Sequence, residues 1–162
     1  EADAVMSDQS DLWRTIRTAD CQQILVYAPR QNVIGLIHVG WKGLVNGVIP
    51  AFFEKLKQDY EIDTAEVIVA AGPSLCTDCA EFTDPVTELI GIDPTFFRGR
   101  NADLRAIADD QLIRCGVMPD HMERLPDCTK CNTDVYWSYR GGDREAVIQG
   151  SSNVLVCRLI NQ

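Results

Sequence analysis

Two apolar segments joined by a short polar turn are the strongest constraint on the fold of this chain. QQILVYA at 22–28 and VIGLIHV at 33–39 are rich in aliphatic and β-branched residues, which favour strands. The residues between them, PRQN, have the composition of a turn. We therefore expect a β-hairpin over 22–39. Pairing across this turn places Cys21 near Val39 and one residue from His38.

The rest of the chain has the pattern of strands that alternate with helices. Further strands are expected at 1–8, 13–20, 65–72 and 121–125, and helices at about 44–60, 84–91 and 101–116. The segment 127–143 is predicted to be a loop with a short aromatic part, and the periodicity of 146–160 fits a strand or a helix. In the absence of a linker or a repeat, this order predicts a single mixed α/β domain over residues 1–162.

A few residues are expected to set the ends of these helices. Pro50 is tolerated only in a first helical turn, so the regular part of the first long helix should begin near Ile49. Asn101 is the expected N-cap of the last helix, and Gly91 and Gly116 are expected stops. The apolar side of the last helix is predicted to consist of Leu104, Ile107, Ala108 and Leu112.

The acidic composition excludes several classes of partner. A formal net charge of -9 on 162 residues opposes binding to nucleic acid or to an anionic membrane, and favours a small-molecule substrate or a protein partner. No apolar run approaches the ~20 residues of a membrane span, and no segment resembles a signal peptide. Seven cysteines indicate reduced thiols in a cytoplasmic protein. Arg98, Arg100 and Arg105 fit either a local anion site or a solvated loop, and the solvated loop is favoured.

Cys21 and His38 lie where predicted strands meet loops, and together they suit zinc, or copper less specifically. A catalytic zinc has about three protein ligands. No third ligand is evident, because His121, the only other histidine, lies in what is predicted to be an ordinary surface turn. The pair also fits a thiol nucleophile with an imidazole base, or a structural role with satisfied hydrogen bonds. The spacing leaves all three interpretations open.

Two CxxC segments form a separate candidate site. CTDC contains Cys76 and Cys79, and CTKC contains Cys128 and Cys131. Paired CxxC segments are typical of zinc sites, but the interval here is longer than that of a usual zinc ribbon. A structural four-cysteine zinc site, a redox pair and free thiols remain open. The other two cysteines, Cys115 and Cys157, are expected in the core.

Several ordered motifs resemble one known family. The segments are ADAVMSD (2–8), TADC (18–21), HVGWKG (38–43), AGPSLCTDCAEF (71–82), DLRAIADDQLIRCGV (103–117) and CTKCNTDVYWSYRGGD (128–143). In this order they resemble the laccase-domain family, also called multicopper polyphenol oxidase-like, or the peptidoglycan-editing and purine nucleoside phosphorylase family. The resemblance covers nearly the whole chain.

This resemblance implies a fold and a metal site. The implied fold is a single α/β domain with mixed β-sheets between helical layers, of the α-β-β-α type. The implied metal, usually zinc, is bound by one cysteine and two histidines, which carry over to Cys21, His38 and a histidine of a V-H-G segment upstream of residue 1. On this resemblance the chain is expected to lack the family's N-terminal segment.

The resemblance also implies a reaction. The leading expectation is a zinc-dependent enzyme that cleaves adenosine or inosine with phosphate. Adenosine deamination is an additional expected activity. The alternatives are a copper-dependent polyphenol oxidase, a peptidoglycan-precursor editing factor and a non-catalytic zinc-binding module. Copper sites favour clusters of histidines, and this chain has two.

Four further residues are candidates for this site, each with an alternative role. Trp41 is expected to stack on a purine or to belong to the core. Lys42 stands where the family commonly has arginine, and contacts phosphate or lies at the surface. Arg140 is a candidate anion contact, although Gly141 replaces the family's second arginine. Asp20 either supports the metal ligands from outside or caps a turn.

Overall fold

Five strands form the main sheet of the computed structural model, which describes residues 2–160; Glu1, the first residue of the expected N-terminal strand, lies outside the described residues. The strand order is β1-β4-β3-β5-β8. The bounds are β1 (Ala4–Ser7), β3 (Gln22–Ala28), β4 (Val33–Val39), β5 (Ile68–Ala71) and β8 (Met122–Arg124). Neighbouring strands are antiparallel except β5 and β8, which are parallel. The sheet is therefore mixed, and the strands expected in these regions are confirmed.

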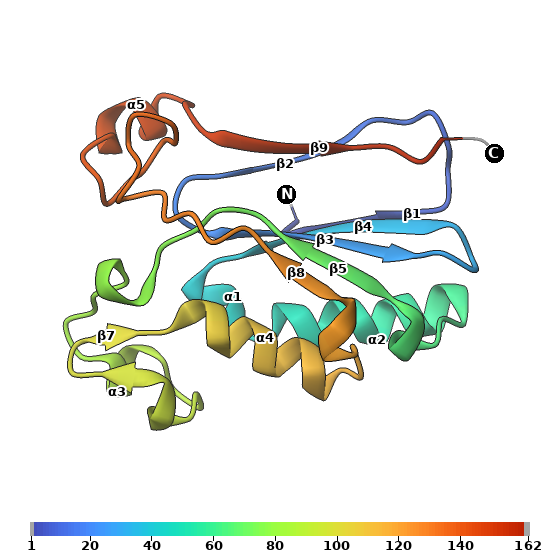
Figure 1. Ribbon diagram of the computed structural model, residues 1–162, viewed down its shortest axis with the longest axis horizontal. Helices are drawn as coiled ribbons and strands as arrows, with labels where there is room; N and C mark the ends of the chain where they lie inside the picture. The colour runs from blue at the N-terminus through green and yellow to red at the C-terminus, as the bar shows by residue number, and fades with distance from the viewer. Residues whose placement is uncertain (1, 161–162) are drawn as a thin grey trace.

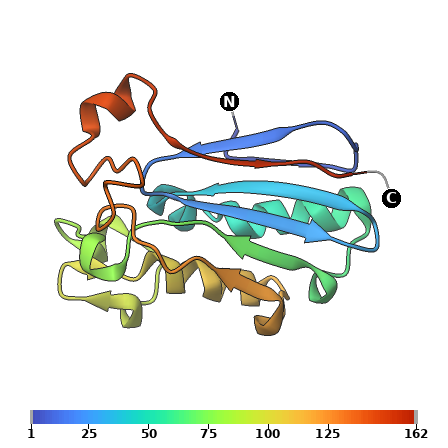
Figure 2. The same ribbon diagram turned by 45° about the horizontal axis from the view of Figure 1, so that its top comes forward.

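A second sheet, a two-stranded ribbon, covers one face of the main sheet. It pairs β2 (Arg14–Thr18) with β9 (Asn153–Cys157) in antiparallel register. Both views show the ribbon on the side away from the long helices (Figures 1 and 2). The side-chain amide of Gln23 on β3 fastens the ribbon there, because it donates to the backbone carbonyls of Ile16 and Asn153.

Helices cover the opposite face of the main sheet. The helices of the described residues are α1 (Trp41–Val45), α2 (Val48–Tyr60), α3 (Pro85–Glu88), α4 (Leu104–Arg114) and α5 (Arg144–Ile148). The short strands β6 (Phe97–Arg98) and β7 (Asn101–Ala102) form a third pair, and 3-10 turns span Thr64–Glu66, Thr77–Cys79, Pro94–Phe96 and Pro119–His121. α1, α2 and α4 lie along the main sheet, whereas α5 lies at one end of the ribbon (Figure 1). The mixed α/β class is confirmed, and in residues 2–160 no helix is long and apolar enough to cross a membrane.

Alternation along β3 and β4 determines which side chains enter the core. Ile24 and Ile37 face the helices, where Phe52 of α2 packs against the same cluster. Gly35 lies on this face too, because a Cβ there would lie 2.3 Å from the Phe52 ring. By the same alternation His38 faces the other side of the sheet.

The register of the hairpin is shifted by one residue from the predicted pairing, which placed Cys21 near Val39. Gln22 lies opposite Val39, and Gln23 lies opposite His38. Cys21 therefore lies one residue beyond the last strand pair, at the open end of the hairpin. This end of the sheet is where the chain leaves β4 and enters α1.

One expected helix is two helices in the structure. The helix predicted over 44–60 is divided by Gly47, whose φ of 73° is a conformation that glycine adopts without steric cost. α1 begins at Trp41, earlier than predicted, and α2 begins at Val48. Pro50 therefore lies in the first turn of α2, where its missing N–H costs no hydrogen bond.

The N-cap expected for α4 was wrong. Asp103 is the cap, since its carboxylate accepts a hydrogen bond of 2.9 Å from the Ala106 N–H, whereas Asn101 lies in β7. The expected stops are supported by the positive φ values of Gly91 and Gly116. The segment 146–160 contains both of its possible structures, the end of α5 and then β9. On the predicted apolar side of α4, Ile107, Ala108 and Leu112 are buried and Leu104 is half-buried.

Candidate active site and metal centre

Cys21 and His38 lie on the same face of the hairpin, beside Gly40. Because Gln23 is opposite His38, the cysteine is a diagonal neighbour of the histidine across the two strands. A Cβ at Gly40 would lie 3.0 Å from the Cys21 Sγ and 3.8 Å from the His38 Nε2. Both donor atoms therefore face the space that the glycine leaves free.

A carboxylate holds the other side of the imidazole. The His38 Nδ1 lies 3.1 Å from the Asp3 Oδ1, and the His38 backbone N–H donates to the Asp3 carbonyl. An imidazole that donates its Nδ1–H to a carboxylate keeps the Nε2 lone pair for a metal ion. The donor set of Cys21 and His38 therefore fits a metal, although the described residues contain no third metal-binding side chain that joins this pair in a cluster.

His121 does not supply that third ligand. It ends the 3-10 turn before β8, and the pairing of β8 with β5 and of β5 with β3 places this turn at the opposite end of the sheet from Cys21. The predicted turn is confirmed, but the residue is half-buried, and its Nδ1 is buried without a hydrogen-bond partner.

The environment of Cys21 disfavours a free thiolate. Burial, followed by the charge of Asp20, raises the pKa of the Cys21 thiol to about 11, although Arg140 opposes this shift. A nucleophilic cysteine needs a lowered pKa. A metal ion deprotonates a coordinating thiol outright. Burial of this kind thus fits a metal ligand better than one half of a thiol–imidazole nucleophile.

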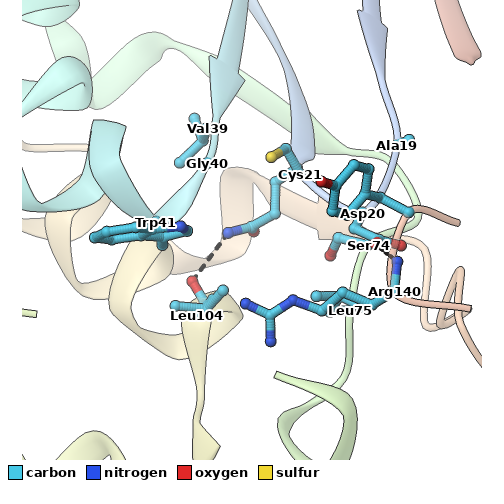
Figure 3. Close-up of a pocket in the computed structure, with 12 residues that line it drawn as sticks. Ala19, Asp20, Cys21, Val39, Gly40, Trp41, Ser74, Leu75, Leu104 and Arg140 are labelled. Carbon is cyan, nitrogen blue, oxygen red and sulfur yellow. Dashed lines mark hydrogen bonds between the residues drawn. The ribbon is translucent and has the colours of Figure 1, made fainter. Parts of the chain in front are cut away.

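Two hollows meet at Cys21, and together they contain every residue proposed for the reaction from the sequence. The first is a cavity of about 270 Å³ whose lining includes Asp20, Cys21, Gly40, Trp41 and Arg140 (Figure 3). The second shares Cys21, Gly40 and Trp41 with it and adds His38 and Lys42. Residues from three separate parts of the chain are thereby brought to one place.

Asp20 anchors one wall of the cavity. It is buried, and its carboxylate accepts hydrogen bonds of 2.7 Å from the hydroxyls of Thr129 and Ser138. The same carboxylate accepts a hydrogen bond of 2.8 Å from the Arg140 N–H. These contacts support the role of a loop anchor, one of the two roles expected for this residue.

Two aromatic rings and two cations form a row of contacts, of which Trp41 and Arg140 line the cavity. Trp41 meets Phe82 edge to face, with 6.0 Å between ring centroids. The Lys42 ammonium lies 5.5 Å from the Trp41 centroid, and the Arg140 guanidinium lies 5.2 Å from the Phe82 centroid. Arg140 also donates to the Glu81 carbonyl. Positive charge therefore lies at both ends of an apolar wall.

The three clustered arginines have different roles. Arg98 and Arg100 are mostly exposed, as a solvated loop requires. Arg105 on α4 differs, because its guanidinium donates to the backbone carbonyls of Ser74 and Asp127. The favoured interpretation, a solvated loop, is therefore wrong for Arg105, whose guanidinium stabilises two neighbouring segments.

The remaining cysteines fall into two groups. The Sγ atoms of Cys76, Cys79, Cys128 and Cys131 lie within 4.8 Å of one another, and we call them the four-cysteine cluster. Cys115 packs half-buried against the main core, as expected. Cys157 is half-buried on the ribbon and does not belong to that core.

Two residues of the site were not expected from the sequence. The sequence predicts Asp3 only as part of a strand, within the motif ADAVMSD. Phe82 had no local signal, because its contact with Trp41 joins parts of the chain that are distant in sequence.

Known proteins similar to this chain include enzymes of purine metabolism. A purine nucleoside phosphorylase of Clostridium acetobutylicum is 32% identical over 152 residues, which cover 90% of this chain and 64% of the relative. Purine nucleoside phosphorylase LACC1 of Mus musculus is 29% identical over 149 residues, 85% of this chain and 34% of the relative. Adenosine deaminase RL5 of an unknown prokaryotic organism is 26% identical over 150 residues, 85% of this chain and 56% of the relative. The chain thus spans about half the length of the curated relatives that it matches.

A solved structure and a sequence family complete the comparison. The crystal structure of YlmD from Geobacillus stearothermophilus has a TM-score of 0.88 and 23% identity over 99% of this chain and 62% of that chain. At this identity the likeness shows the fold alone. The family described as multi-copper polyphenol oxidoreductase laccase matches residues 1–157. The match over nearly the whole chain shows that this protein belongs to the multi-copper polyphenol oxidoreductase laccase family.

Proposed function

We propose that this chain forms the active-site cavity of an enzyme that cleaves purine nucleosides with phosphate, with a metal ion bound by Cys21 and His38. The observation that carries the proposal is that the Cys21 Sγ and the His38 Nε2 face the same space at Gly40, beside a cavity lined by aromatic rings and cations. The similarity to purine nucleoside phosphorylases supports this reaction class. Because a catalytic zinc uses about three protein ligands, the proposed site needs one ligand beyond this pair.

Zinc is the metal that we propose for this site. Thiolate and imidazole donors suit zinc, and copper less specifically. Asp3 is the kind of outer carboxylate that fixes the orientation of a ligating imidazole. When bound, the ion would supply Lewis-acid polarisation of a substrate atom. The side chains around it would bind and orient the substrate.

The row of cations and rings supports binding of phosphate and a nucleoside. Arg140 and Lys42 would form charge-assisted hydrogen bonds with phosphate oxygens, and arginine would offer two parallel donors where lysine offers a point charge. Trp41, which is half-buried against Phe82, would stack its free face on the purine. Phosphate held beside the sugar C1′ would turn a bimolecular attack into an oriented one.

Release of the free base in the presence of phosphate tests this function. The wild-type protein should release adenine or hypoxanthine from the nucleoside only when phosphate is added. Cys21→Ala should lower the rate by ~100-fold or more, because loss of a ligand exceeds the 10–100-fold cost of losing an outer partner. Cys115→Ala changes a cysteine outside the cavity and should retain the wild-type rate. Equal release by wild type and Cys21→Ala would contradict the proposal.

Two other reactions are distinguished from phosphorolysis by what they release or consume. Adenosine deamination releases ammonia without phosphate, and the relative named adenosine deaminase makes it the second candidate. Copper-dependent phenol oxidation consumes oxygen in proportion to bound copper, but two histidines are few for copper.

The cytoplasmic location stays a prediction, which the seven free cysteines support.

A further inference from the structure

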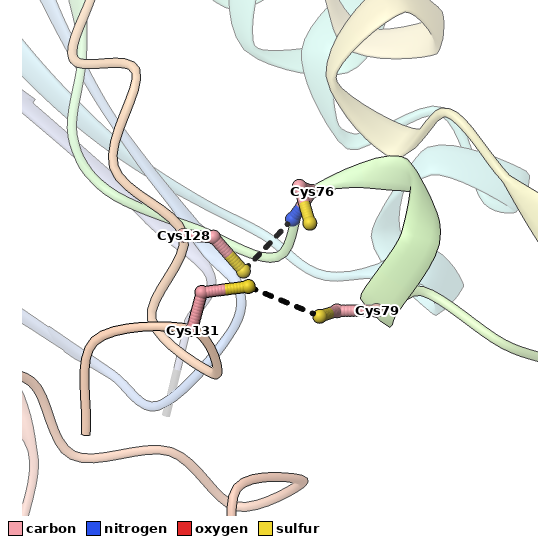
Figure 4. Close-up of side chains that lie close together, drawn as sticks. All are labelled: Cys76, Cys79, Cys128 and Cys131. Carbon is pink, nitrogen blue, oxygen red and sulfur yellow. Dashed lines mark hydrogen bonds between the residues drawn. The ribbon is translucent and has the colours of Figure 1, made fainter.

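The four-cysteine cluster lies apart from the Cys21–His38 pair and has no role in the proposed reaction. Its four Sγ atoms lie within 4.8 Å of one another, and those of Cys79 and Cys131 are 3.5 Å apart. A tetrahedral zinc ion with Zn–S bonds of about 2.3 Å separates its sulfurs by about 3.8 Å. Figure 4 shows side chains of the two segments converging on one space. The cluster therefore has the size of a four-thiolate zinc site.

Two backbone turns direct these sulfurs toward one another. In the first segment, the Cys79 N–H donates to the Cys76 carbonyl across a 3-10 turn. In the second, the backbone N–H and the side-chain amide of Asn132 both donate to the Cys128 carbonyl. The Cys76 N–H also donates to the Cys128 Sγ at 3.3 Å. This last donor stabilises a thiolate at Cys128 and orients it as a metal ligand.

The backbone that leads into the two turns is also held together. Ser74 and Cys128 form a parallel β-bridge, in which the Ser74 N–H donates to the Asp127 carbonyl and the Thr129 N–H donates to the Ser74 carbonyl. Arg105 donates to backbone carbonyls on both segments. The ligands are thus organised by contacts that do not involve a metal, so less conformational freedom is lost when an ion binds.

We propose that Cys76, Cys79, Cys128 and Cys131 bind one structural zinc ion. Four thiolates at tetrahedral spacing fill the coordination of zinc and leave no position for a substrate. The ion joins the segment after β5 to the segment after β8. The latter segment continues through Thr129 to Ser138 and Arg140, which Asp20 binds. The zinc therefore fixes the wall of the cavity that carries Arg140.

Zinc content and thiol protection test this proposal. The double variant Cys79→Ser/Cys131→Ser should lose one zinc equivalent per chain, and Cys115→Ser should keep it. In the zinc-loaded wild type, alkylation of the exposed Cys131 should be about tenfold slower than after treatment with a chelator. The rate at Cys115 should not respond to the chelator. Cys21→Ser removes only the other proposed site, so failure of one metal proposal is distinguishable from failure of the other.

A measurement on a protein with an intact four-cysteine cluster covers the case in which the double variant does not fold. Cobalt(II) loaded in place of zinc into Cys21→Ser should give the absorption of a tetrahedral four-sulfur site. Unchanged zinc in the folded double variant, bound iron in place of zinc, disulfides within the cluster of the freshly purified protein, or equal Cys131 alkylation with and without chelator would each overturn the proposal.

Discussion

The Cys21–His38 pair and the four-cysteine cluster use similar donor atoms in opposite arrangements. The pair lies at the open end of the β3–β4 hairpin, offers two ligands and borders a cavity of about 270 Å³. The cluster lies on two turns in loops, and its four sulfurs are close enough to surround one ion. An incomplete ligand set beside a cavity suits chemistry, whereas a complete one suits architecture.

The largest effect is expected for Asp20→Ala, because Asp20 connects these two regions. Removal of its carboxylate leaves the buried hydroxyls of Thr129 and Ser138 without their acceptor. We expect the free energy of unfolding, measured in urea, to fall by about 3 kcal/mol. Asp59→Ala, a change at an exposed surface pair, should cost less than ~0.5 kcal/mol. A cost for Asp20→Ala as small as that of the control would show that the loop is held by other contacts.

Asp3→Ala should weaken metal binding at the Cys21–His38 pair without affecting the four-cysteine cluster. It removes the carboxylate that lies 3.1 Å from the His38 Nδ1 and leaves the four-cysteine cluster untouched. Metal affinity at the Cys21–His38 pair should fall by about 10–100-fold, which is the usual cost of losing an outer partner. Competition with a chelator measures it in a Cys79→Ser/Cys131→Ser background, with Asp59→Ala as the matched control. Unchanged affinity would mean that the imidazole is oriented without this carboxylate.

Strand register explains why the pair could be predicted from the sequence and the cluster could not. The turn at PRQN placed Cys21 near His38 to within one residue. Side chains in a strand alternate with a period of two, so the observed register puts both side chains on the same face. The cluster depends on the bridge between Ser74 and Cys128, a pairing between loops that no local pattern specifies. The two CxxC segments alone therefore left three interpretations open.

Helix ends were less predictable because local preferences competed. The apolar period of 44–60 continues through Gly47, so it gave no sign that a positive φ divides α1 from α2. Asn101 and Asp103 are both good capping residues. Pairing of β6 with β7 takes Asn101 into a strand, and Asp103 is left as the cap. In each case a tertiary contact or a backbone turn overrode a pattern that was correct in kind.

The smallest effect is expected for Lys42→Ala, which should alter phosphate binding and neither metal region. Lys42 is exposed at the start of α1, with its ammonium over the Trp41 ring. Loss of an exposed cation costs about 1 kcal/mol or less, so KM for phosphate should rise by up to about fivefold while kcat and metal content stay constant. Lys55→Ala, at another exposed lysine, should leave KM unchanged.

Lys42→Arg completes this prediction, because it keeps the charge and adds a fork of donors. If Lys42 contacts phosphate, the arginine variant should match or lower the wild-type KM, in contrast to the alanine variant. If both variants have the wild-type KM, Lys42 is a surface residue. Arg140, whose backbone Asp20 binds and whose guanidinium lies over Phe82, would then be the one remaining cation of the row. Phosphate recognition would in that case depend on the wall that the four-cysteine cluster is proposed to fix, and the two regions would be coupled through a single arginine.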